Sequence, residues 1–283
     1  MIVGVVVLYN PISEEVINNI SSFIGYLDKL LIFDNSEKEN KRIANYYRNN
    51  LKVTYKCFKE NFGIAYALNK GIDFAKENNA EWLLTMDQDS SFCEGNFKRF
   101  VDIVKITVNL NQDGVIFSPL HKVPYLNEEK GVKKVKTVMT SGNLINMRLV
   151  DKVGFFEDRL FIDSVDHEYC YRISVKGYSV YRVNEIELEH NLGEITVKYL
   201  FGKKIFVTNH NYVRRYYITR NVLYVKKKYS ENNIKFMKFL VYHLILSLLT
   251  IVLFETDKTL KFKSMWMGLF DYVHGNLGKK RFK

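Results

Sequence analysis

The chain of 283 residues is poor in both cysteine and proline, with three residues of each. Its cysteines, Cys57, Cys93 and Cys170, stand far apart and form no CxxC pair. An odd and scattered set argues against a disulfide framework and against a zinc knuckle, and it predicts a reducing compartment. The scarcity of proline excludes long Pro-rich linkers.

The N-terminus lacks the basic segment that opens a signal peptide. Met1–Val5 leads directly into apolar residues, so we interpret it as the start of a buried strand. Hydrophobic residues make up 47% of the chain, which is enough for a substantial core and excludes intrinsic disorder. The length fits one large α/β domain with an appendage, or two small domains.

Acidic residues are scarce in the last third of the chain. Residues 196–283 hold 18 lysines and arginines against 4 acidic residues, a net charge of +14. The first 195 residues hold 24 basic and 27 acidic residues, a net charge of −3. This asymmetry predicts an anionic partner for the C-terminal region, namely nucleic acid, a phospholipid surface or a diphosphate.

A hydrophobic run long enough to span a membrane is also missing. Phe239–Phe254 has 16 residues without Asp, Glu, Lys or Arg, whereas a span needs about 20 apolar residues. Lys226–Lys228 precede this run, and Lys258, Lys261 and Lys263 follow it. A buried core helix or a dimer interface would explain the run. We favour a helix that lies in the interface of an anionic membrane.

Short apolar runs alternate with segments of helical periodicity over the first ~120 residues. We expect strands at Ile2–Leu8, Leu30–Phe33, Lys52–Cys57, Trp82–Met86 and Gly114–Phe117, and helices from Ser13, at Ile64–Glu77 and at Phe97–Val108. This alternation predicts a doubly wound α/β unit with a mostly parallel sheet flanked by helices.

The remainder of the chain predicts a change from α/β to helical structure. Residues 120–140 are polar and irregular. Ordered segments are expected at Ser141–Met147, Ser164–Lys176 (helix), Tyr178–Val183 (strand), Asn209–Lys228 and Asn232–Phe254 (helices), with a last amphipathic stretch to His274. We therefore expect an α/β domain over residues 1–208 and a basic, amphipathic helical region over residues 209–283.

Polar residues follow the predicted strands at the points where they end. They are Asn10, Asp34, Asn35, Asp87 and Asp89. Ligands of open α/β sheets bind beyond the carboxyl ends of the strands, so this edge is the predicted site.

Asp87-Gln88-Asp89 places two carboxylates on alternate residues directly after an apolar strand. Both can reach one hard divalent cation, and Mn²⁺ and Mg²⁺ favour oxygen ligands that bridge to phosphate. A solvated acidic turn is the competing interpretation. The position after a strand favours the metal site.

Two further segments on this edge have a functional and a structural interpretation. Asp34-Asn35 can hold a nucleobase or ribose, or can close the strand with an Asx-turn. Asn61-Phe62-Gly63, followed by Asn69, can present free N–H groups of a helix start to a ligand, or can form an N-capped helix with a glycine turn.

Three acidic residues lie close together at 163–168. Asp163 and Asp166 are candidates for a general base, and one of them is expected to cap the following helix instead. Glu168 contacts substrate or forms a helical i,i+4 pair with Arg172.

Three more candidates come later in the chain. Ser141-Gly142 allows close approach to a sugar, or is an ordinary turn. His190 is a metal ligand or phosphate contact, or a structural histidine. Arg215 and Arg220 grip a diphosphate, or belong to a solvated basic helix face.

Taken in order, these motifs resemble the family 2 inverting glycosyltransferases with the GT-A fold. The resemblance is carried by Tyr9-Asn10-Pro11, Asp34-Asn35, Asn61–Ala65 with Asn69 and Gly71, and Asp87–Ser90. The later motifs look like the bacterial rhamnosyltransferase branch, which builds cell-wall and capsular polysaccharides. They are Ser141-Gly142, Gly154–Glu157, Phe161–Glu168, His190 with Gly193, and Arg215 with Tyr217 and Asn221.

The resemblance implies a role for each candidate. The nucleotide would be held by Tyr9, Asn10, Asp34, Asn35, Asn61, Gly63, Asn69, Asp87 and Gln88. Asp87, Asp89 and His190 would hold Mn²⁺ or Mg²⁺, Arg215 and Arg220 the diphosphate, and Ser141, Gly142 and Glu168 the sugar or acceptor. Asp166 would be the base, with Asp163 as the alternative.

The resemblance implies transfer of L-rhamnose from dTDP-L-rhamnose, with inversion, and we expect a lipid-linked glycan as the acceptor. The predicted location is the cytoplasm, peripheral at the inner face of the plasma membrane. A UDP-sugar (UDP-galactose, UDP-galactofuranose or UDP-GlcNAc) is the alternative donor. The sequence is also compatible with a homo-oligomer.

Two other classes of protein were weighed. A nucleotidyltransferase would carry a glycine-rich and basic loop where this chain has Tyr9–Ser13. A nucleic-acid-binding module leaves the acidic strand ends unexplained, because they would repel phosphate without a metal. We therefore expect no nucleic-acid partner.

Overall fold

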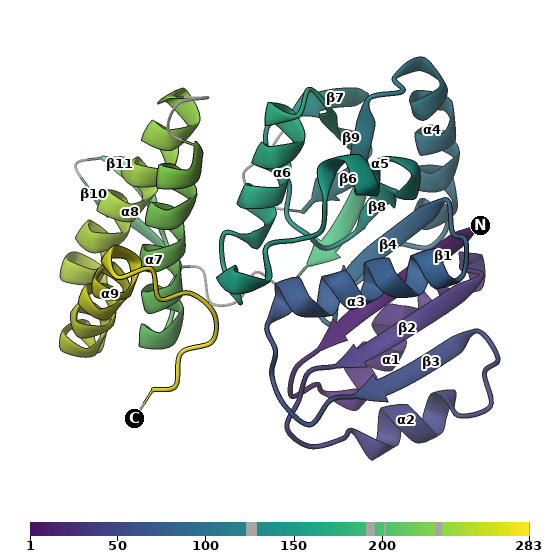
Figure 1. Cartoon of the computed structure of the whole chain (residues 1–283), viewed down its shortest axis with the longest axis horizontal. Coiled ribbons are helices and arrows are strands. Elements are labelled where there is room, and N and C mark those ends of the chain that lie inside the picture. Colours follow the sequence, from purple (N-terminus) through teal and green to yellow (C-terminus); the bar gives the residue numbers. More distant parts are fainter. Residues whose placement is uncertain (123–128, 191–195, 201, 230–233, 283) are drawn as a thin grey trace. The chain divides into compact units, whose positions relative to one another are not determined.

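The computed structural model describes residues 1–122, 129–190, 196–200, 202–229 and 234–282. The chain forms two compact units (Figure 1). The first consists of Met1–Glu157 and Asp166–Asn191, and the second of Asp158–Val165 and Leu192–Lys283. The sequence predicts the division after residue 208. The structure divides the chain earlier because β10 (Thr196–Leu200) and β11 (Lys203–Val207) pair with each other in a separate two-stranded sheet.

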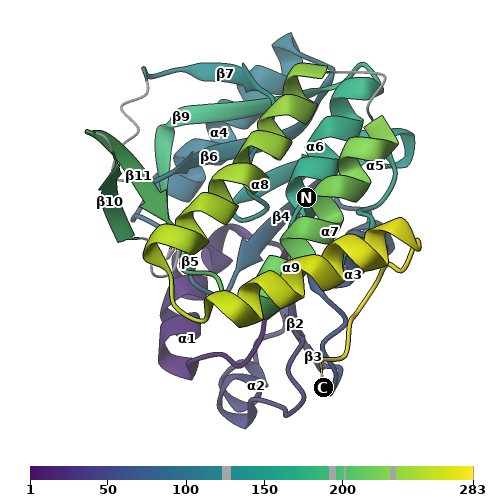
Figure 2. The ribbon, with the colours of Figure 1, turned by 90° about the vertical axis from the view of Figure 1, so that its left-hand side faces the viewer.

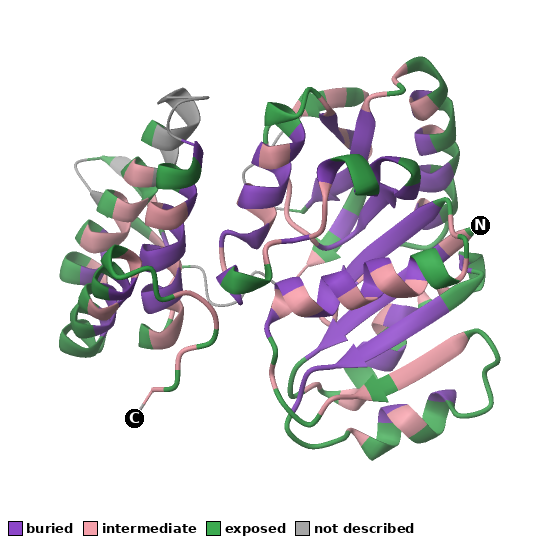
Figure 3. Cartoon of the chain, viewed as in Figure 1, coloured by how far each residue is buried: buried purple, intermediate pink, exposed green. Residues whose placement is uncertain are grey.

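The described part of the first unit contains a nine-stranded sheet of order β3-β2-β1-β4-β8-β6-β9-β5, with β7 paired to β9. Its strands are β1 (Ile2–Leu8), β2 (Lys29–Asp34), β3 (Val53–Cys57), β4 (Trp82–Asp87), β5 (Ser90–Phe92), β6 (Gly114–His121), β7 (Val132–Val135), β8 (Asn143–Asn146) and β9 (Ser179–His190). Figure 3 shows that most of these strands are buried. The five predicted strands of the first ~120 residues are all present.

The prediction of a mostly parallel sheet holds for the N-terminal half and for the pair β6–β9, which is also parallel. β3, β2, β1 and β4 are parallel to their neighbours. β8 runs antiparallel to both β4 and β6, and β5 and β7 run antiparallel to β9, so the whole sheet is mixed. β5 and β7 have only three and four residues, too few for a periodic pattern, and both pair with a strand that is distant in sequence.

Helices cover both faces of this sheet. They are α1 (Ser13–Ser21), α2 (Lys41–Tyr47), α3 (Ile64–Glu77), α4 (Asn96–Leu110), α5 (Met147–Val153) and α6 (Val165–Val175), with a short 3₁₀ turn at Ile24–Tyr26. A second 3₁₀ turn, Asp158–Leu160, belongs to the second unit. Apolar residues of α1, α2 and α4 share one core cluster with Val6, Leu8 and other side chains of the sheet. On the other face α3 packs closely on β1, since a Cβ at Gly71 would lie 2.5 Å from Val5 Cγ1.

The second unit is mainly helical in its described part. It contains α7 (Tyr212–Tyr229), α8 (Ile234–Phe254) and α9 (Lys258–Val273), and each lies within a few residues of its predicted position. No helix in the described ranges combines the length and the apolar character that crossing a membrane requires.

Candidate active site

The sheet brings the predicted strand-end residues together at one edge. In the parallel register Leu8 of β1 pairs with Asp34 of β2, and Val7 pairs with Asp87 of β4. Asp34 and Asp87 therefore flank the end of β1, as the sequence predicts.

A long-range strand pairing adds His190 to this edge. In the antiparallel pair of β5 and β9, Ser90 lies opposite His190. One ligand atom from each of Asp87, Asp89 and His190 lies within 4.8 Å of the others. The His190 Nδ1 is 3.3 Å from Asp89 Oδ1. The structure thus groups the three residues that the resemblance assigns to a metal.

Two serines connect the members of this group. Ser90 Oγ lies 2.7 Å from His190 Nδ1 and accepts a 2.7 Å hydrogen bond from Ser141 Oγ. Ser141 Oγ in turn accepts a hydrogen bond from the main-chain N of Asp87. Ser141 was predicted to meet a sugar, but it is buried and positions this cluster instead. Ser90 belongs to the motif Asp87–Ser90 that carries the family resemblance, but the sequence alone assigns it no role, because only the pairing with β9 places it beside His190.

Gly142 is required by packing. Its φ of +79° is unfavourable for other residues, and a Cβ there would lie 2.8 Å from side-chain atoms of Leu188 and Pro119. The predicted close approach at this glycine is therefore made by the protein's own core.

The electrostatics of Asp87, Asp89 and His190 favour a bound cation. Burial raises the pKa of Asp87 to about 6, and the nearby carboxylates of Asp89 and Asp166 add to this effect while His190 opposes it. Burial alone would lower the pKa of His190, but Asp89 and Asp87 outweigh it and raise that pKa. Asp89 Oδ1 is buried and makes no hydrogen bond, and His190 Nδ1 lies 3.3 Å from it. Two carboxylates and an imidazole fit a divalent metal.

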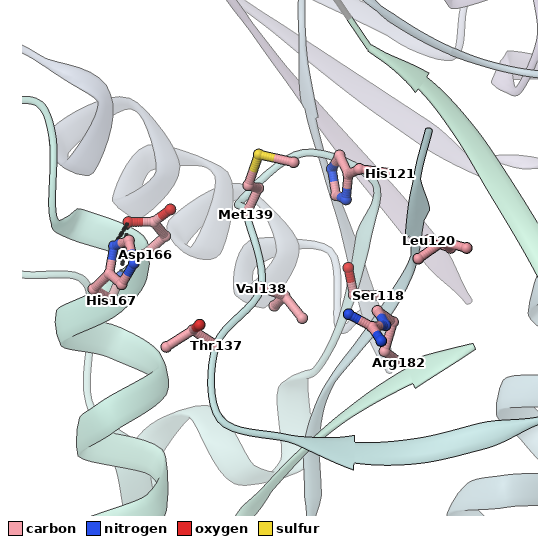
Figure 4. A pocket seen from close by; sticks show the side chains of 9 residues that line it. All are labelled: Ser118, Leu120, His121, Thr137, Val138, Met139, Asp166, His167 and Arg182. Carbon is pink, nitrogen blue, oxygen red and sulfur yellow. Dashed lines mark hydrogen bonds and ion pairs between the residues drawn. The ribbon is translucent and has the colours of Figure 1, made fainter. Parts of the chain in front are cut away.

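Asp166, the predicted base, lines a pocket of about 170 Å³ in the first unit (Figure 4). The other lining residues are Ser118, Leu120, His121, Thr137, Val138, Met139, His167 and Arg182. Asp166 Oδ1 accepts a hydrogen bond from the main-chain N of His167 and lies 2.9 Å from its Nδ1. Burial alone would raise the pKa of Asp166, but the His167 contacts outweigh it and lower that pKa. Asp166 is therefore ionised at neutral pH.

His121 is a pocket residue that the sequence analysis did not single out. It is buried, its Nε2 has no hydrogen-bond partner, and its ring centroid is 5.7 Å from that of His190. Burial and the neighbouring His190 lower its pKa to about 4, so it is neutral. The predicted strand ends at Phe117, whereas β6 continues to His121, so no strand-end signal marked this residue.

The other two acids of the 163–168 segment have protein partners. Asp163 has a φ of +61° and forms a 2.6 Å ion pair with Arg214 inside the second unit. Glu168 is buried and forms a 2.6 Å ion pair with Arg172. The i,i+4 interpretation of Glu168 is confirmed, and its carboxylate is not open to a sugar.

Asp34 and Asn35 form the Asx-turn and loop contacts that were the structural alternative to ligand binding. Asp34 Oδ1 accepts a hydrogen bond from Ser36 N, which is the Asx-turn, and Oδ2 is hydrogen-bonded to Tyr55 Oη. Asn35 Oδ1 accepts a hydrogen bond from Phe62 N, which fixes the loop before α3. Both side chains are buried.

Two other residues predicted to contact the nucleotide, Gln88 and Asn69, form hydrogen bonds with main-chain groups of the protein. The Gln88 amide makes a pair of hydrogen bonds with the main chain of Tyr9, and the Asn69 amide makes a similar pair with Phe156. Tyr9 itself is 45% exposed. Gly63, with φ +87°, directly precedes α3, which agrees with the predicted glycine turn.

Asn10 and Asn61 also hold loops at this edge. The main-chain N of Asn10 donates to Ser36 Oγ, and Asn61 Oδ1 accepts hydrogen bonds from Asn35 Nδ2 and Gly63 N. Asn10 is exposed and has a φ of +48°.

Arg215 and Arg220 do not present open guanidinium groups. Both are buried on α7. Arg215 forms a 2.5 Å ion pair with Glu255, and Arg220 donates to the main-chain O of Gly278. The sequence suggests either a diphosphate contact or a solvated basic helix face. Both interpretations require exposed guanidinium groups, whereas these two are buried.

Comparison with known proteins finds one matching family and a relative that aligns over nearly the whole chain. Residues 5–137 match the family described as Glycosyl transferase family 2. The chain is 27% identical over 301 residues to the dTDP-rhamnosyl transferase RfbF of Shigella flexneri, an alignment that covers 99% of this chain and 98% of that protein.

Two solved structures share the fold. A crystal structure of GalNAc-T7 with UDP, GalNAc and Mn²⁺ has a TM-score of 0.57 at 14% identity and covers 67% of this chain. The TarS structure from S. aureus has a TM-score of 0.54 at 12% identity and covers 96% of this chain. The chain spans 43% and 48% of those two proteins. At this level of identity the two structures show the GT-A fold alone. The family match over residues 5–137 and the similarity to RfbF show that the chain carries a Glycosyl transferase family 2 domain and is a glycosyltransferase.

Proposed function

We propose that the protein transfers L-rhamnose from dTDP-L-rhamnose, with inversion, onto a lipid-linked glycan during synthesis of a bacterial surface polysaccharide. Similarity to RfbF over nearly the whole chain supports this donor. The observation that carries the proposal is the grouping of Asp87, Asp89 and His190 in the unit that also holds Asp166 and its pocket. The proposed place of action is the inner face of the plasma membrane.

Asp87, Asp89 and His190 would hold Mn²⁺ or Mg²⁺. When bound, such an ion neutralises negative charge on the departing diphosphate. Ser90 and Ser141 keep the imidazole and the Asp87 main chain in place through the hydrogen bonds described above.

Asp166 is the proposed general base. An acceptor hydroxyl in the pocket would attack the anomeric carbon from the face opposite the diphosphate and lose its proton to the Asp166 carboxylate. The oxygen–carbon bond forms as the bond to the diphosphate breaks, and the single displacement inverts the anomeric centre. Asp163 is the weaker candidate, because Arg214 already neutralises it.

The nucleotide is assigned to the loops around the end of β1. Tyr9 offers an exposed ring, and Gln88 fixes the main chain beneath it. Gly63 opens the start of α3, where free N–H groups favour phosphate. In this proposal Asp34, Asn35, Asn61 and Asn69 shape these loops.

The donor is tested with a panel of dTDP-L-rhamnose, UDP-galactose, UDP-galactofuranose and UDP-GlcNAc, each with Mn²⁺, Mg²⁺ or EDTA. The measurement is release of the nucleoside diphosphate and the anomeric configuration of the product. We expect turnover of dTDP-L-rhamnose only, loss of activity in EDTA, and an inverted product. Preference for a UDP-sugar would show that the donor is not dTDP-L-rhamnose. A product with retained anomeric configuration would contradict the single-displacement mechanism.

Asp166→Asn tests the base. We expect kcat to fall by about 10²–10⁴-fold, because the amide cannot accept the proton, while dTDP affinity stays within about twofold. Asp163→Asn is the matched control and should keep most of the turnover. If Asp163→Asn abolished transfer and Asp166→Asn did not, the base would be Asp163.

A further inference from the structure

Most of the buried charged side chains lie in the second unit. Among the described residues, seven Asp, Glu, Lys or Arg residues are buried, and five of them belong to this smaller unit. They are Arg215, Arg220, Glu255, Lys261 and Asp271. Charged side chains are rarely buried in proteins that face water on all sides unless they are paired.

These buried charges hold the helices together from the inside. The Glu255 carboxylate lies 2.5 Å from Arg215 and 2.8 Å from Lys261, so it joins α7 to α9. Asp271 of α9 accepts hydrogen bonds from Tyr216 Oη of α7 and from Lys280 Nζ, both at 2.7 Å. Each buried carboxylate is therefore compensated, as a stable polar interior requires.

The outer face of α9 is apolar. Its buried residues are Lys261, Ser264, Met265, Gly268 and Asp271, of which only Met265 is a large apolar residue. The exposed large apolar residues of α9 are Leu260, Phe262, Trp266, Leu269, Phe270 and Val273. Trp266 is 69% exposed and Val273 68%. Phe262, Trp266, Phe270 and Val273 recur at three- and four-residue intervals, so they form one stripe along the helix.

α8 continues this apolar exterior. Its exposed large apolar residues are Tyr242, Ile245, Leu249, Val252 and Leu253, with exposed fractions between 48% and 61%. Figure 2 shows α8 beside α7, with α9 crossing near their lower ends. An apolar surface of this extent marks contact with a partner or a membrane. We call the eleven exposed apolar residues of the two helices the α8–α9 face.

We propose that the α8–α9 face is a membrane-docking surface that lies in the interface of an anionic lipid bilayer. Apolar side chains outside and paired charges inside match a medium that is apolar on one side. Lys258 and Lys263 are exposed on α9 itself, and residues 196–283 carry a net charge of +14, which is complementary to anionic headgroups. This inference goes beyond the transfer reaction and names where the protein meets the membrane that its proposed acceptor occupies.

Flotation of the full-length protein with vesicles tests the proposal. We expect binding to vesicles of phosphatidylcholine and phosphatidylglycerol at low salt, and much weaker binding to phosphatidylcholine alone. Trp266→Ser with Phe270→Ser should weaken binding by about tenfold or more, because two large apolar contacts are lost. Lys258→Gln with Lys263→Gln should weaken it by about fivefold per lysine, and only with the anionic vesicles.

The matched control replaces two exposed apolar residues of the first unit. Leu51 and Ile106 are 100% and 64% exposed, so Leu51→Ser with Ile106→Ser removes similar apolar surface outside the α8–α9 face. This variant should bind vesicles like the unchanged protein. The thermal unfolding midpoint of every variant checks that its fold is intact.

Tryptophan fluorescence gives a second readout, since the chain has two tryptophans. Trp82 is buried and Trp266 is exposed, so Trp82→Phe isolates the signal of α9. Vesicles should shift the Trp266 emission to shorter wavelength, and brominated lipid should quench it.

Three results would overturn the proposal. They are no binding to anionic vesicles at low salt, unchanged binding of the Trp266→Ser, Phe270→Ser variant, and a dimer that this variant dissociates while vesicles do not bind. The last would assign the α8–α9 face to a second copy of the chain. Hydrolysis of the donor without vesicles is measured in parallel, so failure here is distinguishable from failure of the proposed reaction.

Discussion

The Ser90 hydroxyl connects two residues of the proposed metal site through hydrogen bonds. It is 2.7 Å from the imidazole of His190 and accepts a hydrogen bond from Ser141, which itself accepts one from the main chain of Asp87. Hydrogen bonds to the outer atoms of metal ligands commonly orient those ligands and tune metal affinity. Ser90 is therefore a positioning residue.

Ser90→Ala should lower the affinity for Mn²⁺ by about 10–100-fold, because His190 loses the group that orients its ring. Titration followed by electron paramagnetic resonance measures free Mn²⁺ directly. Ser91→Ala is the control, because adjacent side chains of a strand point to opposite faces. Equal affinities of the two variants would remove Ser90 from the metal site.

At the scale of elements, α7 and α9 approach each other closely at Gly268. A Cβ on this residue would lie 2.6 Å from the main-chain O of Tyr216. Main-chain atoms of a helix cannot move aside as a flexible side chain can, so the glycine allows this packing. The hydrogen bond between Tyr216 and Asp271 crosses the same contact between helices.

Gly268→Ala should therefore destabilise the second unit by about 1–3 kcal/mol, since α9 must move away from α7. Urea unfolding of the full chain, followed by Trp266 fluorescence, measures the change. Gly25→Ala is the control, because a Cβ there would have no atom within 4 Å. A midpoint shift no larger than that of the control would show that the helices separate without cost.

The same pair of helices should respond to acid through Asp271. Burial alone would raise the pKa of Asp271, but hydrogen bonds from Lys280, Tyr216 and Asn276 outweigh it and lower that pKa. The unfolded carboxyl has a pKa of about 3.9. Because the folded pKa is lower, ionised Asp271 stabilises the fold at neutral pH, and this contribution is lost as pH falls through the folded pKa.

Asp271→Asn should accordingly lower stability at neutral pH, with a deficit that shrinks below about pH 4. Thermal unfolding midpoints across that range give the measurement. Asp257→Asn, at an exposed position before the same helix, should show little change at any pH. A deficit for Asp271→Asn that did not depend on pH would mean that its charge is not what stabilises α9.

On the scale of the whole molecule, charge is divided between the two units. Carboxylates crowd the edge of the sheet in the first unit, where Asp89 and Asp166 add to the effect of burial on the pKa of Asp87. A divalent cation would relieve this repulsion and bind the folded state in preference to the unfolded one.

Mn²⁺ at about 100 times its dissociation constant should stabilise the folded protein by about 2.7 kcal/mol. Asp89→Ala should abolish this gain. Thermal unfolding with Mn²⁺, with Mg²⁺ and with EDTA measures it, and Ca²⁺ serves as a comparison ion of larger radius. An equal gain for Asp89→Ala would place the ion elsewhere.

Local sequence patterns determined a large part of this protein. Continuous apolar runs give buried strands, and helical periodicity gives α3, α4 and the three helices of the second unit. The parallel strands then bring Asp34 and Asp87 to one edge because the carboxyl ends of parallel neighbours coincide. The reaction class follows from the residues on that edge, as the family match bears out.

Only the tertiary structure decided which polar side chains are open to a ligand. Asn35, Asn69, Gln88 and Glu168 all suit a ligand site by residue type, yet each is bonded to the protein itself. A sequence shows the donor or acceptor but not its partner, and a buried polar group takes the partner that the fold provides.

Local sequence patterns also could not predict the position of His190 or the packing of the second unit. His190 reaches Asp89 through the pairing of β5 with β9, two segments about a hundred residues apart. The paired charges inside α7–α9 and the apolar residues outside them follow from which helix faces meet. Contacts between distant segments depend on packing of the whole chain, so no local pattern encodes them.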